Sequence, residues 1–159
     1  MKLRLFVSCL AVLAFAAGCA SNRSTAPKEA QVLAPGSRLT LKIDVSKSAS
    51  EEGADIYRQR LGQRLAGAGI VTADPQAPRS LEVVLVTYSM RPPAKRALFG
   101  AFAGKDKLQS RVVLKDALTG EVTSEFFVTS QDASSIGSIR GLIEQHADKI
   151  VQSLVPSEP

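Results

Sequence analysis

The sequence predicts a single two-layer α+β domain, in which a mostly antiparallel sheet of about four to five strands carries two helices on one face. Alternating apolar and polar residues, typical of strands, run through 37–45 and 108–130. Apolar residues at helical spacing run through 48–69 and 134–154. The predicted order along the chain is β-α-β-β-β-β-α, and packing both helices on one face of the sheet is the natural solution for this order.

The first strand and the first helix follow from this periodicity. Residues 37–45 place four apolar side chains on one face, namely Leu39, Leu41, Ile43 and Val45. The next helix begins with a capping box of Ser48 and Glu51, or with Ser50 as a rival cap. Its buried face consists of Tyr57, Leu61, Leu65 and Ala68.

The remaining segments complete the sheet and its second helix. Residues 69–79 predict a short strand and a proline-containing turn. The segment 80–90 is apolar on both faces, so we expect it at the centre of the sheet, with Leu81, Val83 and Leu85 opposite Val84, Val86 and Tyr88. Residues 107–130 predict a hairpin with inward-facing Leu108, Val112, Leu114, Val122, Phe126 and Val128. The last helix carries a stripe of Ile136, Ile139, Ile143, Ile150 and Leu154, with Ser134 or Ser135 as its cap and Pro156 at its end.

The first residues have the parts of a secretory signal peptide: a charged start, a short apolar run and a small-residue end. The end of the run resembles the bacterial lipobox, in which cleavage exposes a cysteine that carries fatty acids such as palmitate. Here Ala17 and Gly18 precede Cys19, so cleavage between Gly18 and Cys19 and lipidation of Cys19 are expected. An ordinary secretory signal that happens to contain a cysteine is the alternative.

This interpretation divides the chain and gives it a location. We expect a lipoprotein signal peptide at 1–18, the lipidated cysteine and a flexible tether at 19–36, the globular domain at 37–155 and a tail at 156–159. Ala20 stands where the enterobacterial inner-membrane retention signal has Asp. The resemblance therefore implies an anchor in the outer membrane, with the domain facing the periplasm.

Composition excludes several classes of function. The formal charge of +5 falls to +3 without Lys2 and Arg4, because 18 basic and 15 acidic residues then remain. This diffuse excess does not indicate a nucleic-acid partner. The two cysteines are Cys9, which leaves with the signal peptide, and Cys19, so we expect no disulfide and no thiolate metal ligand in the domain. No metal and no cofactor are expected.

Catalytic residues are not recognisable in the sequence. His146, the only histidine, lies at the edge of a helical stripe, which predicts a partly exposed side chain. No Gly-x-Ser-x-Gly motif occurs. The acidic pairs Glu51–Glu52 and Asp116–Glu121 lie at a helix start and in a turn, where acids have structural roles. We therefore expect that the protein is not an enzyme.

The connection 91–107 is longer than a hairpin requires, and long connections are usually functional or disordered. Its apolar residues are flanked by basic ones, which suits contact with an anionic membrane surface or a partner protein. The candidate contact residues are Arg91, Lys95, Arg96, Leu98, Phe99, Phe102, Lys105 and Lys107. The alternative is that the segment extends the two strands and buries Phe99 and Phe102 in the core.

The glycine-rich run "ALFGAFAGKDKLQSRVVLKDALTGEV", which follows a lipobox, an amphipathic helix and a central strand, resembles a family of small bacterial envelope lipoproteins, the domain of unknown function DUF4410. The resemblance covers most of 37–154, is strongest over 95–130, and implies no catalytic residues. We expect a non-catalytic binding or assembly accessory of the cell envelope, held to the membrane at Cys19 and bound to an envelope protein. A periplasmic carrier with a ligand pocket between helices and sheet is the alternative, and a hydrolase is a third.

Overall fold

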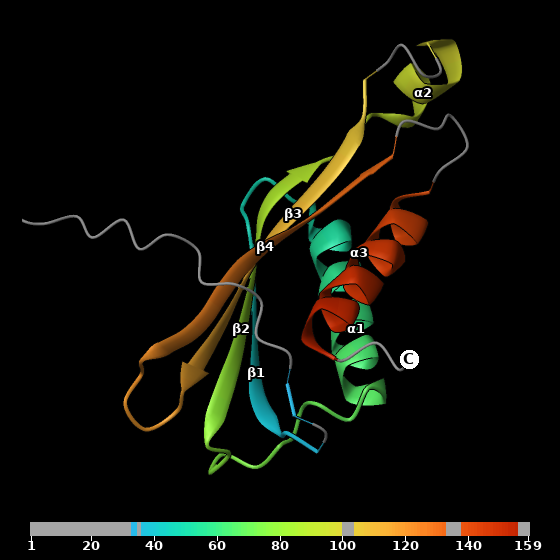
Figure 1. Ribbon diagram of the computed structural model, residues 1–159. Helices are drawn as coiled ribbons and strands as arrows, with labels where there is room; N and C mark the ends of the chain where they lie inside the picture. The colour runs from blue at the N-terminus through green and yellow to red at the C-terminus, as the bar shows by residue number, and fades with distance from the viewer. Residues whose placement is uncertain (1–32, 35, 100–103, 133–137, 156–159) are drawn as a thin grey trace, which may run out of the picture.

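The chain folds into one four-stranded sheet that is covered on one face by two long helices (Figure 1). The structure is a computed structural model that describes residues 33–34, 36–99, 104–132 and 138–155. The strands are β1 (Leu39–Val45), β2 (Arg79–Ser89), β3 (Asp106–Asp116) and β4 (Val122–Asp132). The helices are α1 (Glu51–Gly67), α2 (Pro93–Phe99) and α3 (Ile139–Leu154), of which α1 and α3 cover the sheet.

The predicted α+β fold class is confirmed. Strand order in the sheet is β1-β2-β3-β4. β1 runs parallel to β2, because α1 crosses over between them, whereas the other neighbours are antiparallel. The short strand predicted over 69–79 is reduced to a single bridge between Val71 and Leu39. Pro75 and Pro78 follow within seven residues, and since proline lacks a backbone N–H, neither can donate to a longer ladder.

Both long helices begin at a serine cap. Ser50, and not Ser48, caps α1 by accepting a hydrogen bond of 3.2 Å from a backbone N–H of the first turn. Ser138 caps α3 in the same way at 3.0 Å. The caps predicted for this helix, Ser134 and Ser135, lie outside the described residues.

The core lies between the sheet and the two long helices. α1 contributes Tyr57, Leu61 and Leu65, as predicted, whereas Ala68 is exposed because the helix ends at Gly67. The strands and α3 add Leu39, Leu81, Val83, Leu85, Leu108, Val112, Leu114, Ile143, Ile150 and Leu154. Each such aliphatic side chain contributes about 1.5–3 kcal/mol through burial, so this cluster is the main source of stability.

The packed domain begins before residue 37. Leu33 is buried, and its backbone N–H donates a 2.8 Å hydrogen bond to the carbonyl of Leu154 at the end of α3. A residue that the sequence assigned to the tether is therefore part of the core. The chain enters the domain at the end of the sheet where β1 begins (Figure 1).

A bulge in β2 reverses the predicted facing of Tyr88. The register shifts between Leu85 and Thr87, so Val86 is an extra residue with no partner in β3. After this insertion Tyr88 pairs with Leu108 and packs against the core on the helix-covered face. The sequence predicted Tyr88 on the opposite face from Leu85, because strict alternation does not anticipate an inserted residue.

Candidate functional site

A short helix, α2, stands beyond the end of the sheet, on the connection between β2 and β3 (Figure 1). The sequence predicted this connection as a long loop or as extensions of the two strands. Pro93 suits the first helical position, and the Ala, Lys, Arg and Leu residues that follow favour a helix. Among the described elements, α2 packs extensively against none of the others.

Arg91 and Asp106 close the base of this connection. The backbone N–H of Arg91 donates to Asp106 Oδ1 at 2.6 Å, and its guanidinium donates to both carboxylate oxygens at 3.2 Å. The guanidinium also donates to the carbonyl of Asp132 at the end of β4. Arg91 is only 7% exposed. The prediction of Arg91 as a contact residue is therefore corrected: its charge is used inside the protein, where a two-point ion pair fixes the start of the connection.

Leu98 and Phe99 are exposed at the end of α2, with 77% and 58% of their surface open to solvent. The alternative in which Phe99 extends a strand and enters the core is therefore wrong. Phe102 lies outside the described residues. Two adjacent large apolar side chains on a projecting helix make an exposed apolar patch, which is typical of a contact surface.

Basic residues flank this apolar pair. Lys95 and Lys105 are exposed, Lys107 is half-buried in β3, and the side chain of Arg96 lies outside the described part. The single acid of the connection is Asp106, which is buried with its arginine partner. We call Lys95, Leu98, Phe99 and Lys105 the α2 tip. Two of these side chains are apolar, and the two lysines are positively charged.

An open hollow of about 300 Å³ lies at the same end of the domain, where α1 and α3 begin. We call it the N-terminal cleft, and its lining includes Glu52, Gly53, Ile56, Tyr88, Ile139 and Arg140. A Cβ on Gly53 would lie 2.2 Å from the hydroxyl oxygen of Tyr88, so only glycine lets the ring pack this closely against α1. The apolar lining is half-buried, and Glu51 and Glu52 are exposed in the first turn of α1.

A chain of buried polar side chains connects both long helices to the sheet. Ser110 Oγ of β3 is hydrogen-bonded to the hydroxyl of Tyr57 at 2.7 Å and to His146 Nε2 at 2.8 Å. His146 Nδ1 is hydrogen-bonded to Ser130 Oγ of β4 at 3.0 Å. The prediction of a partly exposed His146 is wrong, because the ring is fully buried on the same helical face as Ile143. These contacts hold α1, α3, β3 and β4 together.

Burial decides the charge state of this chain. It lowers the pKa of His146 to about 4, and the positive charge of Lys149 acts in the same direction. It also raises the pKa of the Tyr57 hydroxyl far above its ordinary value. Both groups are therefore neutral at neutral pH, which allows them to stay in the core without a counter-charge.

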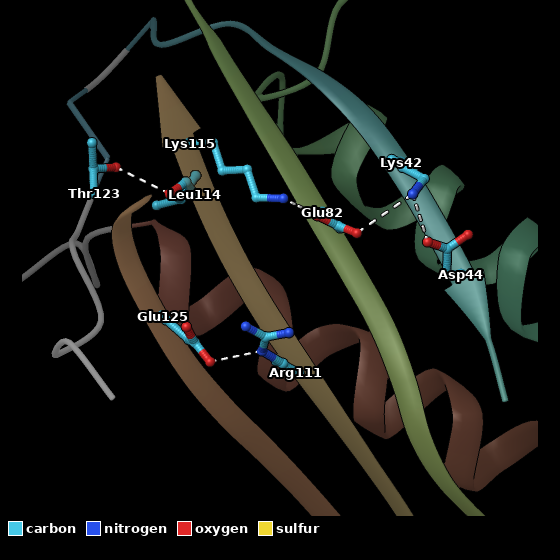
Figure 2. Close-up of polar contacts among 8 residues, drawn as sticks. All are labelled: Lys42, Asp44, Glu82, Arg111, Leu114, Lys115, Thr123 and Glu125. Carbon is cyan, nitrogen blue, oxygen red and sulfur yellow. Dashed lines mark hydrogen bonds and ion pairs between the residues drawn. The ribbon is translucent and has the colours of Figure 1, made fainter. Parts of the chain in front are cut away.

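The sheet face away from the helices carries opposite charges paired across strands (Figure 2). The charged side chains drawn there are Lys42, Asp44, Glu82, Arg111, Lys115 and Glu125. Glu82 accepts hydrogen bonds from Lys115 and, at 3.5 Å, from Lys42; Arg111 Nε donates to Glu125 at 2.7 Å. The lysine and arginine hydrogen bonds lower the pKa of Glu82 and of Glu125. Since the charges of these six side chains cancel, they give this face no net charge that would attract a charged partner.

The sequence predicts that the domain binds no metal and that the membrane anchor is at Cys19. Within the described residues, no three His, Cys, Asp or Glu side chains gather closely enough to hold a metal ion. No helix in the same part of the chain has the length and hydropathy that a membrane span needs. The predicted cleavage and lipidation residues, Gly18 and Cys19, lie outside the described residues.

Comparisons with known proteins agree with this architecture. The model of the domain of unknown function DUF4410 matches residues 26–134. A comparison with curated proteins finds no match. Among solved structures, the chain is similar to PelC from Paraburkholderia phytofirmans, a dodecamer, at 13% identity and a TM-score of 0.59, over 81% of this chain and 95% of that one. It is also similar to the hypothetical protein CT253 from Chlamydia trachomatis, at 10% identity and a TM-score of 0.52, over 72% of this chain and 93% of that one. At such low identities the likeness shows a shared fold.

Proposed function

This chain belongs to the DUF4410 family, a domain of unknown function, and we propose that it is a lipid-anchored protein of the bacterial envelope that acts by binding and assembly, without catalysis. The α2 tip is the observation that carries the proposal. Leu98 and Phe99 are largely exposed, and α2 packs extensively against no other described element, yet a buried ion pair closes the base of the connection that carries them. Such an arrangement suits a protein whose apolar side chains are buried by a partner.

The opening segment supports the anchored location. A tether of 13 residues, 20–32, would join the acylated Cys19 to Leu33, where the chain enters the core. As a flexible coil these residues would span about 20 Å. Two or three acyl chains make a membrane anchor effectively permanent, whereas one chain binds only marginally. Ala20 favours sorting to the outer membrane, with the domain in the periplasm.

Self-association is part of the proposal. PelC, which shares the fold, is described as a dodecamer, and we extend the capacity for self-assembly to this chain. Anchoring in one leaflet confines the copies to a thin layer and raises their effective concentration. A contact that is weak in free solution can therefore assemble anchored copies.

Mass spectrometry of the full-length protein, extracted from membranes with detergent, tests the anchor. We expect a polypeptide that begins at Cys19 and carries fatty acids, and Cys19→Ser should lose the acyl mass. A mature chain that begins at another residue, or that carries no fatty acid, contradicts the proposed function.

A further inference from the structure

We infer that the α2 tip of one copy docks into the N-terminal cleft of a second copy, an inference that rests on the proposed assembly function. The two surfaces differ in charge in a complementary way. Lys95 and Lys105 are the positive charges of the tip, whereas Glu52 lines the cleft and Glu51 lies beside it in the first turn of α1. Opposite charges at the rim of a contact raise the rate of association and fix its orientation.

The apolar parts of the two surfaces also match. The tip presents Leu98 and Phe99, and the cleft presents Ile56, Tyr88 and Ile139, which are half-buried in the free protein. Docking removes both sets from water, and apolar burial is the main driving force of protein association.

Arg140 fixes the direction of approach. It lines the cleft from α3, whereas Glu52 lines it from α1, so the two helices bring opposite charges to the cleft. The lysines of a docked tip are attracted to the α1 side and repelled from the α3 side. This contrast predicts a single orientation in which the tip lies along α1.

The cleft of a chain is not filled by its own tip. No described residue of α2 lines the cleft, and α2 extends past the end of the sheet, away from α1 and α3 (Figure 1). Because tip and cleft are different surfaces, the contact between copies is heterologous. Repetition of a heterologous contact makes a ring when it closes and a filament when it does not.

Both surfaces lie at the end of the domain opposite to the point where the chain enters it. The chain enters the domain beside the start of β1, whereas Tyr88 of the cleft and the base of α2 lie at the other end of β2. β2 has 11 residues and is therefore about 35 Å long. Copies that stand side by side, with their tethers in one leaflet, bring the tip of each to the cleft of the next.

Disulfide cross-linking of full-length protein in membranes tests this contact. The only native cysteines are Cys9 and Cys19, so new ones can be placed on a thiol-free domain. Phe99→Cys and Glu52→Cys are made in separate copies with different tags, coexpressed and oxidised. We expect a mixed disulfide that contains both tags, and its loss when Lys95→Glu is added to the first copy. Adding Glu51→Lys to the second copy, beside the cleft cysteine, should restore it.

Matched controls decide the outcome. Leu118 is 92% exposed in the β3–β4 turn at the opposite end of the sheet, so Leu118→Cys in place of Phe99→Cys should give no mixed product. The inference is overturned if Leu118→Cys gives as much product as Phe99→Cys, if Phe99→Cys pairs only with itself, or if no product forms. Mass spectrometry of the same samples separates the two failures: acylated protein without cross-links refutes the docking alone, whereas unacylated protein refutes the proposed function.

Discussion

The carboxylate of Asp106 and the guanidinium of Arg91 form a buried two-point ion pair between residues 15 positions apart in the sequence. The pair joins the first residue of β3 to the segment that follows β2, so it fixes both ends of the connection that carries α2. The same guanidinium reaches the carbonyl of Asp132, which ties this connection to the end of β4.

Asp106→Asn should destabilise the domain by about 3 kcal/mol, because it leaves the buried Arg91 without a counter-charge. Urea unfolding followed by circular dichroism measures the change. Lys105→Ala is the control: this neighbour is exposed, and its removal should change the unfolding free energy by no more than about 0.5 kcal/mol. Equal stabilities of the two variants would show that the ion pair does not hold the connection.

His146 should make the stability of the domain sensitive to acid. Its folded pKa of about 4 lies below the ordinary 6.5, so the unfolded chain binds the proton more readily. The stabilisation from the neutral histidine is complete above pH 6.5 and is lost as pH falls toward 4, by about 2 kcal/mol at pH 5. Urea unfolding of the wild type and of His146→Gln between pH 7.5 and 5 checks this. The two curves should converge as pH falls, and parallel curves would contradict the assignment.

Glu82→Gln should cost about 1 kcal/mol, because it removes the charged acceptor shared by Lys42 and Lys115. Glu82 and its two lysine partners lie on an open sheet face, so salt should screen their attraction. The difference between variant and wild type should shrink in 1 M KCl relative to about 0.1 M. A difference that is independent of salt would show that Glu82 acts through packing.

The α2 tip should be unimportant for folding. Leu98→Ser with Phe99→Ser removes two exposed side chains and should leave the midpoint of thermal unfolding unchanged, as should Leu118→Ser. A clear loss of stability in the double variant alone would mean that the tip packs against its own domain. In that case it would not be a free contact surface.

Much of the fold could be predicted because it depends on local periodicity. The helical period of α1 alone predicts the buried stripe of Tyr57, Leu61 and Leu65. The two-residue period of one strand likewise predicts the alternation in β3. The exceptions come from contacts between distant segments. The bulge at Val86, which turns Tyr88 inward, depends on how β2 pairs with β3.

The candidate site was only partly predictable for the same reason. His146 is three residues after Ile143, at the edge of the apolar stripe, which predicted a partly exposed ring. The ring is buried because its two partners, Ser110 and Ser130, come from strands far away in the sequence. Arg91 belongs by sequence to a basic cluster, and only the fold brings Asp106 beside it. The N-terminal cleft combines two helix starts with the end of a strand, and no single segment contains its pattern.

In-cell photo-cross-linking tests most directly whether α2 is where this protein binds a second copy. A photoreactive amino acid replaces Leu98 in one sample and Leu118 in another, in full-length protein expressed with its own leader. We predict a product of twice the protein's mass from position 98, whose cross-linked peptide includes Glu52 or Ile139, and none from position 118. Equal products from both positions, or attachment of position 98 to lipid alone, would contradict the account.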